Sequence, residues 1–327
     1  FIKGESAYFM CLNRNKKSVT LNLKNEKGRE ILYSLARKCD VFLENFTPGV
    51  TERLAIDYKT LYNINPRIIY CSISGFGQTG PYRDRPAYDI IMQGMGGLMS
   101  ITGEPDRAPV RIGVAITDIG AGMYAAIAIL SALIAREKTG KGQWIDVSMF
   151  DGAISWMTYM AANYFATGEN PKRMGSAHPS IVPYQCFETS DGKYIIIAVG
   201  NDRIWKDFCK ALDCEKLAKD AKFATNPKRV ENRNELIDKL VKIFLTKTRD
   251  EWLRILTDNG VPCAPVYTMN EIFFDPQALH RNMLVEIEHQ IAGKIKQIGI
   301  PIKFLDTPLT INTPPPLLGQ HTNEILR

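Results

Sequence analysis

The chain has 327 residues, of which 45% are hydrophobic and 23% are charged, and its formal net charge is +6. This composition is typical of a globular protein with ample material for a core, and the length predicts two domains or one large one. The positive excess is mild and scattered, so it does not indicate nucleic acid binding, whereas a small anionic ligand fits it.

The cysteines and histidines narrow the class of protein. Seven cysteines, an odd number with no C-x-x-C pair, predict free thiols in a reducing compartment, and we expect a cytoplasmic protein. The four histidines have no metal-ligand spacing, so no metal site is expected. The opening "FIKGESAYF" lacks the basic and apolar regions of a signal peptide.

In the first part of the chain, strand-like and helix-like segments alternate. Lys17 to Lys24, "KSVTLNLK", alternates like a strand, and "NEKGREILYSLARKC" has apolar residues at helical spacing. A strand, a helix and a strand are then predicted in "DVFLENF", "TERLAIDYKTLYNINP" and "RIIYCSISGFG". This alternation predicts an α/β fold with a doubly wound, Rossmann-like parallel sheet. No β-α unit precedes the first strand, so we expect that the unit which normally opens such a fold is missing.

A long apolar run from Ile119 to Ala135 follows. It is shorter than the roughly 20 residues of a membrane span and rich in glycine and alanine, so we expect a buried core helix and no membrane insertion. The next segment, "TGKGQWIDVSMFDGAISWMTYMAANYF", predicts a basic turn, a strand and another apolar helix.

The second part is patterned differently. Residues 166–185 are rich in Gly, Pro and Ser and predict a linker or mobile loop. Residues 186–285 contain the hairpin-like strand "DGKYIIIAVGND" followed by charged helices, which predicts a small domain. A Pro-rich tail, residues 286–327, ends in a short helix start.

The stretch "GFGQTG" matches the glycine pattern of dinucleotide-binding loops. That interpretation requires a helix starting at the third glycine, so that its N-terminus meets the pyrophosphate. Gly80 is instead followed by "PYRDRPAYD", whose two prolines oppose a helix. We therefore interpret these glycines as an active-site loop.

Asp118 is the single acid between Val110 and Ala135. One interpretation is an N-cap, because Asp is preferred there and a helix is expected from Ile119. The other is a nucleophilic carboxylate held at a helix N-terminus and walled by apolar residues. The two interpretations are compatible.

Six phrases occur in order across nearly the whole chain: "ENFTPGVTERL", "GFGQTGPYRDRPAYD", "GLMSITGEPDRAPVRIGVAITDIGAGMYAA", "TGKGQWIDVSMFD", "GVPCAPV" and "LLGQHTNEIL". Together they closely resemble the class III CoA-transferases, the family of formyl-CoA transferase and carnitine CoA-transferase. The resemblance implies that Asp118 attacks an acyl-CoA thioester and forms aspartyl anhydride and aspartyl-CoA intermediates. Such intermediates need a site shielded from water.

The resemblance also implies which residues line the CoA groove: Leu21, Lys24, Asn45, Phe46 and Arg53. CoA is a substrate and product here, and no separate cofactor is expected. "GSAHPS" lies where the family has a glycine-rich lid, and its His178 is either a site residue or a turn cap. The fold implied is a large domain (1–165 and 286–327) with a smaller α+β domain (186–285) inserted after a linker or lid (166–185), and two chains interlocked as a homodimer.

The same superfamily includes α-methylacyl-CoA racemases, which need two acid–base groups facing the α-carbon. The racemase resemblance predicts a histidine at the position of Tyr88. A tyrosine has an ordinary pKa of about 10 and makes a poor base, so Tyr88 favours transfer. Tyr88 and its neighbour Asp89 are both expected to contact the bound acyl-CoA, and Asp89 is a candidate for positioning the acyl group. A racemase and a non-catalytic CoA-binding protein are the alternatives.

Several arginines lie near these motifs, and a guanidinium suits the far carboxylate of a dicarboxylic acid. The stretch "AYDIIMQGMGGLMSITGEP" also resembles the succinyl-CoA-using members of the family. We therefore expect acyl-CoA and small carboxylic acids as partners, with a donor of the succinyl-CoA type and a dicarboxylic or hydroxy-acid acceptor. These arginines are Arg83, Arg85, Arg107 and Arg111.

Overall fold

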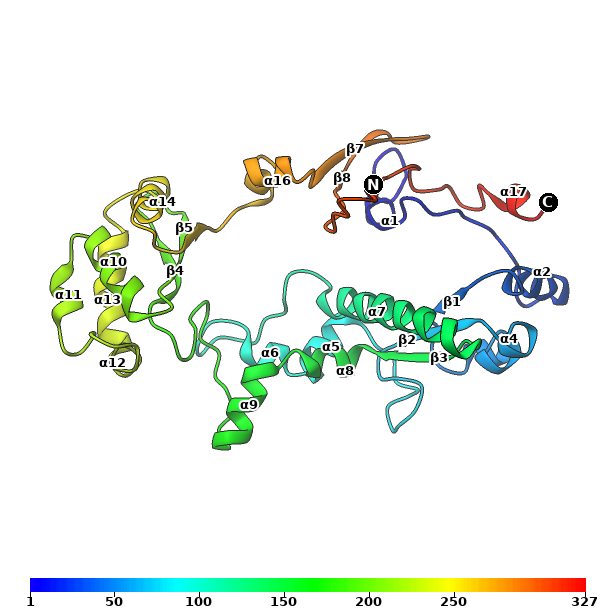
Figure 1. The fold of residues 1–327 in the computed structure, drawn as a ribbon, viewed down its shortest axis with the longest axis horizontal. Coiled ribbons are helices and arrows are strands. Elements are labelled where there is room, and N and C mark those ends of the chain that lie inside the picture. Colours follow the sequence, from blue (N-terminus) through cyan, green and yellow to red (C-terminus); the bar gives the residue numbers. More distant parts are fainter. The chain divides into compact units, whose positions relative to one another are not determined.

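The structure, a computed structural model, describes residues 1–327 and divides into two compact units (Figure 1). One unit is continuous and runs from Ala36 to Val266. The other is built from both ends of the chain, Phe1–Leu35 and Tyr267–Arg327. The domain boundaries expected from the sequence stay predictions.

Three parallel strands form a sheet in the continuous unit, in the order β1 (Val41–Glu44), β2 (Ile69–Ser74) and β3 (Trp144–Ser148). In the register of the sheet, Leu43 lies beside Cys71. The central strand β2 is almost entirely buried, as expected for a parallel strand that is covered on both faces. The predicted α/β fold with a parallel sheet is therefore confirmed.

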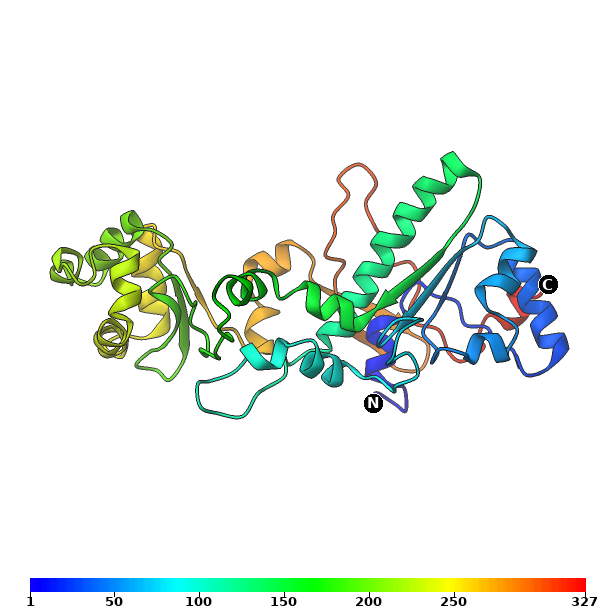
Figure 2. The same ribbon diagram turned by 90° about the horizontal axis from the view of Figure 1, so that it is seen from below.

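The long helix α7 (Ile116–Thr139) lies along one face of this sheet (Figures 1 and 2). Its Ala121 and Ala125 pack with Cys71 and Val147 of the strands in one buried cluster. By length and composition alone α7 could cross a membrane, and only 22% of its most apolar window is buried. The expected buried core helix is thus buried on one face and exposed on the other in the single chain.

Of the shorter helices in this unit, α5 (Asp89–Met95) and α8 (Met149–Ser155) pack against α7, and glycines set their spacing. A Cβ on Gly120 would lie 2.0 Å from the ring of Trp156, and one on Gly96 would lie 2.5 Å from the Cβ of Ala153. These contacts leave no room for a side chain, so the glycines allow α7 and its neighbours to pack closely. The shorter helices are α3 (Val50–Arg53), α4 (Tyr58–Ile64), α5 (Asp89–Met95), α6 (Leu98–Ile101), α8 (Met149–Ser155) and α9 (Thr158–Thr167).

Two predicted elements are wrong in detail. The expected strand from Lys17 to Lys24 is irregular chain, because its backbone bonds to side chains of the C-terminal segment instead of a neighbouring strand. The single helix expected after β1 is divided into α3 and α4. Ala55 takes a positive φ of 54°, and Asp57 starts the second helix by accepting a hydrogen bond from the N–H of Thr60.

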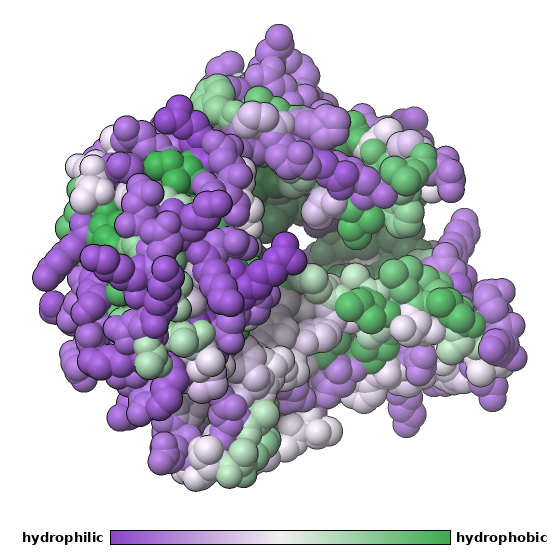
Figure 3. Space-filling model, turned by 60° about the vertical axis from the view of Figure 1, so that its left-hand side comes forward, coloured by the Kyte–Doolittle hydropathy of each residue, from purple (hydrophilic) through white to green (hydrophobic).

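The rest of the continuous unit has an antiparallel sheet, with the order β4-β5-β6, covered by charged helices. Its core is aromatic: the rings of Phe187 and Phe244 stack 4.6 Å apart, and Phe244 also contacts Trp252. The part of the surface that comes forward in Figure 3 is mostly hydrophilic, consistent with the charged patterning of these helices. The elements are β4 (Tyr184–Glu188), β5 (Tyr194–Ala198), α10 (Asp202–Ala211), α11 (Glu215–Lys219), α12 (Asn226–Glu231), α13 (Arg233–Phe244), α14 (Arg249–Asp258) and β6 (Cys263–Pro265).

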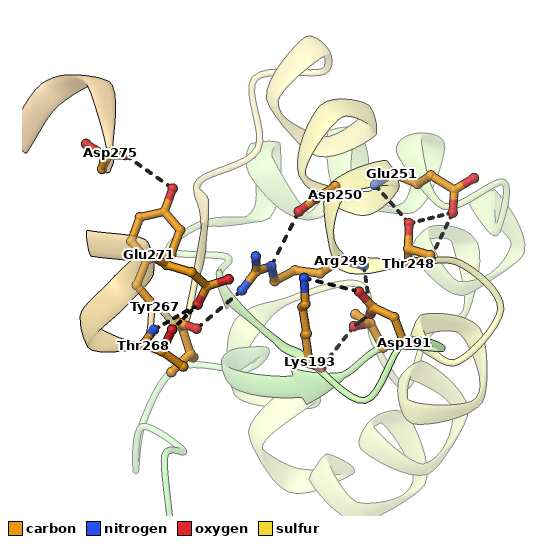
Figure 4. A network of polar contacts seen from close by, with 12 residues as sticks. Asp191, Lys193, Thr248, Arg249, Asp250, Glu251, Tyr267, Thr268, Glu271 and Asp275 are labelled. Atoms are coloured by element: carbon orange, nitrogen blue, oxygen red, sulfur yellow. Dashed lines mark hydrogen bonds and ion pairs between the residues drawn. The ribbon is translucent and has the colours of Figure 1, made fainter. Parts of the chain in front are cut away.

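Asp191, in the turn between β4 and β5, ties this hairpin to the start of α14 (Figure 4). Its carboxylate accepts hydrogen bonds from the Thr189 hydroxyl at 2.6 Å and from the Arg249 N–H at 3.2 Å. The bond from Thr189 is the main cause that lowers the pKa of Asp191. Thr248 and Glu251 cap the same helix end reciprocally.

The unit made of both chain ends is held by a hairpin and by long-range hydrogen bonds. The hairpin strands pair antiparallel and pack on Met10. Further along, the Ser18 N–H donates to Nδ1 of His321, and Asn15 donates to and accepts from backbone groups of Thr310 and Thr313. Both ends of the chain therefore fold as one body. Its elements are α1 (Ala7–Leu12), α2 (Glu26–Ala36, ending in the other unit), α15 (Met269–Ile272), α16 (Pro276–His280), β7 (Leu284–His289), β8 (Gly293–Ile298) and α17 (Thr322–Ile325).

Candidate active site

A cleft of about 440 Å³ lies at the carboxyl ends of the three parallel strands. In open parallel sheets, ligands bind at this edge because the loops that follow the strands converge there. The lining comes from the ends of β1, β2 and β3, from the loop before α5, and from the first turns of α7. The lining residues are Asn45–Pro48, Ile73–Gly75, Arg83, Arg85–Asp89, Asp118, Ala121, Gly122 and Met149.

Asp118 enters this cleft from the first turn of α7. The interpretation of Asp118 as the N-cap is wrong, because the helix already begins at Ile116 and Asp118 is its third residue. The N-cap position is Ala115, whose side chain makes no capping bond. The helix end is capped from outside: a carboxylate oxygen of Asp89 accepts hydrogen bonds from the N–H and the hydroxyl of Thr117, both at 2.9 Å.

Asp89 is in turn fixed by Gln93, which is completely buried. The Gln93 amide donates to the second carboxylate oxygen of Asp89 at 2.7 Å, and its carbonyl oxygen accepts from the Ile112 N–H at 2.8 Å. Both oxygens of Asp89 therefore have partners in the protein. This network joins α5, the loop before α7 and α7 itself, and it fixes the turn that carries Asp118.

The Asp118 carboxylate itself receives no hydrogen bond from the protein, and its pKa is raised, first by partial burial and second by the negative charge of Asp89. The helix N-terminus has the opposite effect, since its dipole favours an anion. A carboxylate without hydrogen bonds keeps its lone pairs available for attack. The expectation of a site shielded from water is not met in the single chain, where Asp118 is solvent-exposed within an open cleft.

Other residues singled out in the sequence lie in the same cleft. Tyr88 is 73% exposed and stands directly before α5. Asn45 and Phe46 follow β1, and the N–H of Phe46 donates to the buried carboxylate of Glu44 at 2.8 Å. The structure therefore brings Tyr88, Asp89, Asn45 and Phe46 together with Asp118.

Three expected CoA contacts do not line the cleft. Arg53 is exposed at the end of α3, which follows the cleft residues Asn45–Pro48. Leu21 and Lys24 belong to the unit made of the chain ends, so their contact with CoA stays a prediction.

His178 is placed as a turn cap rather than in the cleft. Its ring stacks on Tyr159 at 5.7 Å and contacts Tyr184 at 5.4 Å, while Nδ1 accepts from the Ser180 N–H. Of the two interpretations of His178, the structure of the single chain favours the cap.

The glycine loop shapes one wall of the cleft. A Cβ on Gly75 would lie 2.1 Å from the Cβ of Ala87, so only glycine lets the two ends of this loop touch. No helix begins at Gly80, and the next helix starts at Asp89. This geometry does not offer a helix N-terminus to a pyrophosphate, in agreement with the rejection of a dinucleotide loop.

Sequence reasoning missed Thr117 and Gln93. The spacing of Gln93, four residues after Asp89 on a helix, was the available signal for that pair. Thr117 gave none, because its partner Asp89 lies in a different element. The structure contains no group of three His, Cys, Asp or Glu residues that could hold a metal ion.

The comparison with known proteins agrees with this site. The profile of CoA-transferase family III matches residues 1–322, and the chain belongs to that family. It is accordingly an enzyme of the class III CoA-transferase type, as the sequence motifs indicated.

Relatives named as CoA-transferases and a solved structure align with nearly the whole chain. The chain is 43% identical to human succinyl-CoA:glutarate CoA-transferase over 327 residues, which is 100% of this chain and 74% of the relative. It is 39% identical to succinate–glutarate CoA-transferase of Agrobacterium fabrum, covering 98% of this chain and 80% of the relative. A crystal structure of a CAIB/BAIF family protein from Brucella suis aligns with a TM-score of 0.87 and 45% identity, over 98% of this chain and 83% of the other.

Proposed function

We propose that this enzyme moves CoA from succinyl-CoA to a dicarboxylic acid acceptor, with Asp118 as the covalent nucleophile. The observation that carries the proposal is the Asp118 carboxylate, held without hydrogen bonds in a cleft at the carboxyl edge of a parallel sheet. The names of the relatives, which pair succinyl-CoA or succinate with glutarate, support the choice of donor and acceptor.

The first half of the reaction frees the donor acid. An oxygen of Asp118 attacks the thioester carbonyl carbon, the carbon–sulfur bond breaks, and CoA thiolate leaves a mixed succinyl–aspartyl anhydride. The thiolate then attacks the aspartyl carbonyl, which releases succinate and leaves an aspartyl-CoA thioester. The energy of the thioester is kept in covalent form through both steps.

The second half repeats this chemistry with the acceptor. A carboxylate of the acceptor attacks the aspartyl-CoA thioester, expelling CoA thiolate and forming a second anhydride. The thiolate attacks the acceptor carbonyl, which forms the new acyl-CoA and restores the Asp118 carboxylate. In this scheme Asp89 keeps the first turn of α7 in place, and Tyr88 borders the reacting groups.

We assign the CoA contacts to residues around and beside the cleft. Asn45 and Phe46 lie at its wall, and Arg53 has an exposed guanidinium suited to a phosphate. Leu21 and Lys24 complete the set by the family resemblance. Removing the Arg53 charge should raise the KM for the acyl-CoA and leave the KM for the acceptor unchanged.

A homodimer, interlocked as the family resemblance implies, is part of this proposal. The exposed face of α7 carries five apolar side chains that are between 48% and 68% exposed. Their spacing places them on one side of the helix. A second copy covering this stripe would also cover the Asp118 end of α7 and exclude water there. The residues are Ile119, Met123, Ile127, Leu130 and Ile134. A cytoplasmic location stays our prediction.

Mass spectrometry of the protein incubated with succinyl-CoA and then hydroxylamine tests the proposal. Hydroxylamine converts an activated aspartyl carbonyl into a hydroxamate, so the peptide containing Asp118 should carry that mass change. The same treatment of the Asp118→Asn variant should leave the peptide unmodified. Transfer activity without any modification of Asp118 would overturn the proposed mechanism.

A further inference from the structure

The Arg85 guanidinium is a charged group in the cleft that has no hydrogen-bond or ion-pair partner in the protein. Arg85 lines the same cleft as Asp118 and is exposed. Its guanidinium stacks over the ring of Tyr82, 3.9 Å from the centroid, and it makes no hydrogen bond or ion pair with the protein. Its N–H donors are therefore available to a ligand that enters the cleft.

The other arginines near the site do not offer such a group. Arg83 also lines the cleft, but it donates to the Gln78 carbonyl at 2.8 Å and is paired with Asp84 at 3.3 Å and Glu52 at 3.7 Å. Arg107 and Arg111 do not line the cleft. Among the four arginines, Arg85 alone combines a place in the cleft with an unused guanidinium.

The position of Arg85 is fixed before a ligand arrives. Its N–H donates to the Tyr82 carbonyl at 2.9 Å, and the proline that follows restricts its backbone to extended conformations. The Tyr82 ring beneath it contacts Phe76 edge-on at 5.4 Å, and Phe76 contacts Phe150 at 5.7 Å. The aromatic row connects the guanidinium to the first turn of α8, and this contact reduces the side-chain freedom that is lost on binding.

The carboxylates of Asp89 and Asp84 do not compete for Arg85. Both oxygens of Asp89 are occupied by Thr117 and Gln93, and Asp84 is paired with Arg83. Asp118 has to remain free to react. A carboxylate that arrives with the substrate fits the vacant fork, since a guanidinium binds it through two parallel hydrogen bonds.

We infer that Arg85 is the specificity residue that binds the distal carboxylate of the dicarboxylic acid while the other carboxylate reacts at Asp118. This inference rests on the proposed function and adds the residue that separates dicarboxylic from monocarboxylic substrates. A monocarboxylic acid of the same length leaves the guanidinium without its partner and binds more weakly.

The test compares glutarate with pentanoate, which lacks only the distal carboxylate, with succinyl-CoA as the donor. The unmodified enzyme should prefer glutarate in kcat/KM. Arg85→Gln should lower kcat/KM for glutarate on the order of 10- to 100-fold, leaving pentanoate nearly unchanged. Arg85→Lys keeps the charge without the forked geometry, so its kcat/KM for glutarate should lie between those of the unmodified enzyme and Arg85→Gln. Arg107→Gln, an exposed arginine outside the cleft, is the matched control and should match the unmodified enzyme.

Two outcomes would overturn the inference. If Arg85→Gln lowers kcat/KM equally for glutarate and pentanoate, and also weakens the binding of free CoA in calorimetry, then Arg85 contacts a CoA phosphate instead. If the preference for glutarate survives in Arg85→Gln, Arg85 does not select the acceptor.

A second measurement needs no turnover. Phenylglyoxal modifies free guanidinium groups, and glutarate should protect Arg85 in the presence of CoA where pentanoate does not. Equal modification with both acids would overturn the role of Arg85. If the unmodified protein transfers CoA to no acid, the proposed function fails, and this protection experiment still decides the inference.

Discussion

Asp118 and Asp89 are both carboxylates, yet their surroundings give them different roles. Asp89 accepts three hydrogen bonds and fixes a helix end, whereas Asp118 accepts none and has a raised pKa. The sequence identified both residues, because motifs record residue type and order. It gave Asp118 the wrong position in its helix, because the true cap comes from a segment far away in the sequence.

The pH dependence of transfer should report the ionisation of Asp118 and the influence of the Asp89 charge on it. Only the ionised Asp118 attacks, so kcat/KM should fall on the acid side as Asp118 is protonated. Asp89→Asn removes the nearby negative charge that helps raise the Asp118 pKa, so the acid limb should move to lower pH. A pH–rate profile of both proteins measures this. An unmoved limb would show that Asp89 does not act on Asp118 electrostatically.

Replacing Asp118 should separate activity from stability. Asp118→Asn should lower transfer at least about a thousandfold, because no covalent intermediate can form. The raised pKa means that the fold binds the Asp118 proton more tightly than the unfolded chain does. The stabilisation that the protonated Asp118 contributes is present below the ordinary pKa of 3.8, and it is lost as the pH rises through the raised pKa of the folded protein.

At neutral pH the Asn variant should therefore melt no lower than the unmodified enzyme. Any advantage in Tm should shrink as the pH is lowered toward 3.8. Thermal melts across this pH range measure the difference. A lower Tm for the variant at neutral pH would assign Asp118 a structural role instead.

At the scale of the elements, the two glycines at the start of α7 make a matched pair. A Cβ at Gly120 would overlap the Trp156 ring, whereas a Cβ at Gly122 would have nothing within 4 Å. Gly120→Ala should lower the free energy of unfolding by about 1–3 kcal/mol through overpacking. Gly122→Ala should raise it by up to about 1 kcal/mol through helix propensity. Urea denaturation distinguishes the two, and equal stability would show that α8 yields to the added methyl group.

Elements with a strong local pattern were predictable, and those that depend on distant partners were not. The pattern predicted β1, β2, α7 and β5, because their apolar residues follow the period of the element. The segment from Lys17 to Lys24 has the period of a strand, but the C-terminal segment supplies side-chain groups rather than a strand edge. The hydrophobic pattern of a segment shows which of its faces is apolar, but it does not show which groups will bind its backbone N–H and C=O groups.

At the scale of the whole molecule, the apolar stripe of α7 predicts the oligomeric state. The double variant Ile127→Glu, Leu130→Glu places two charges in the centre of the stripe and should convert a dimer into monomers, with loss of transfer activity. Light scattering after gel filtration measures the mass. Lys216→Gln, an exposed lysine on the separate helix α11, should leave the dimer intact. A monomeric unmodified protein would contradict the proposed assembly.

The hydrogen bond between Ser18 and His321 joins residues that are 303 positions apart, while the unit from Ala36 to Val266 is continuous. On the ribosome, the continuous unit can fold as soon as its last strand emerges. The segment Phe1–Leu35 cannot complete its packing until the chain around His321 has been synthesised. Chaperones that bind the nascent protein should therefore protect Phe1–Leu35 for longer than the continuous unit.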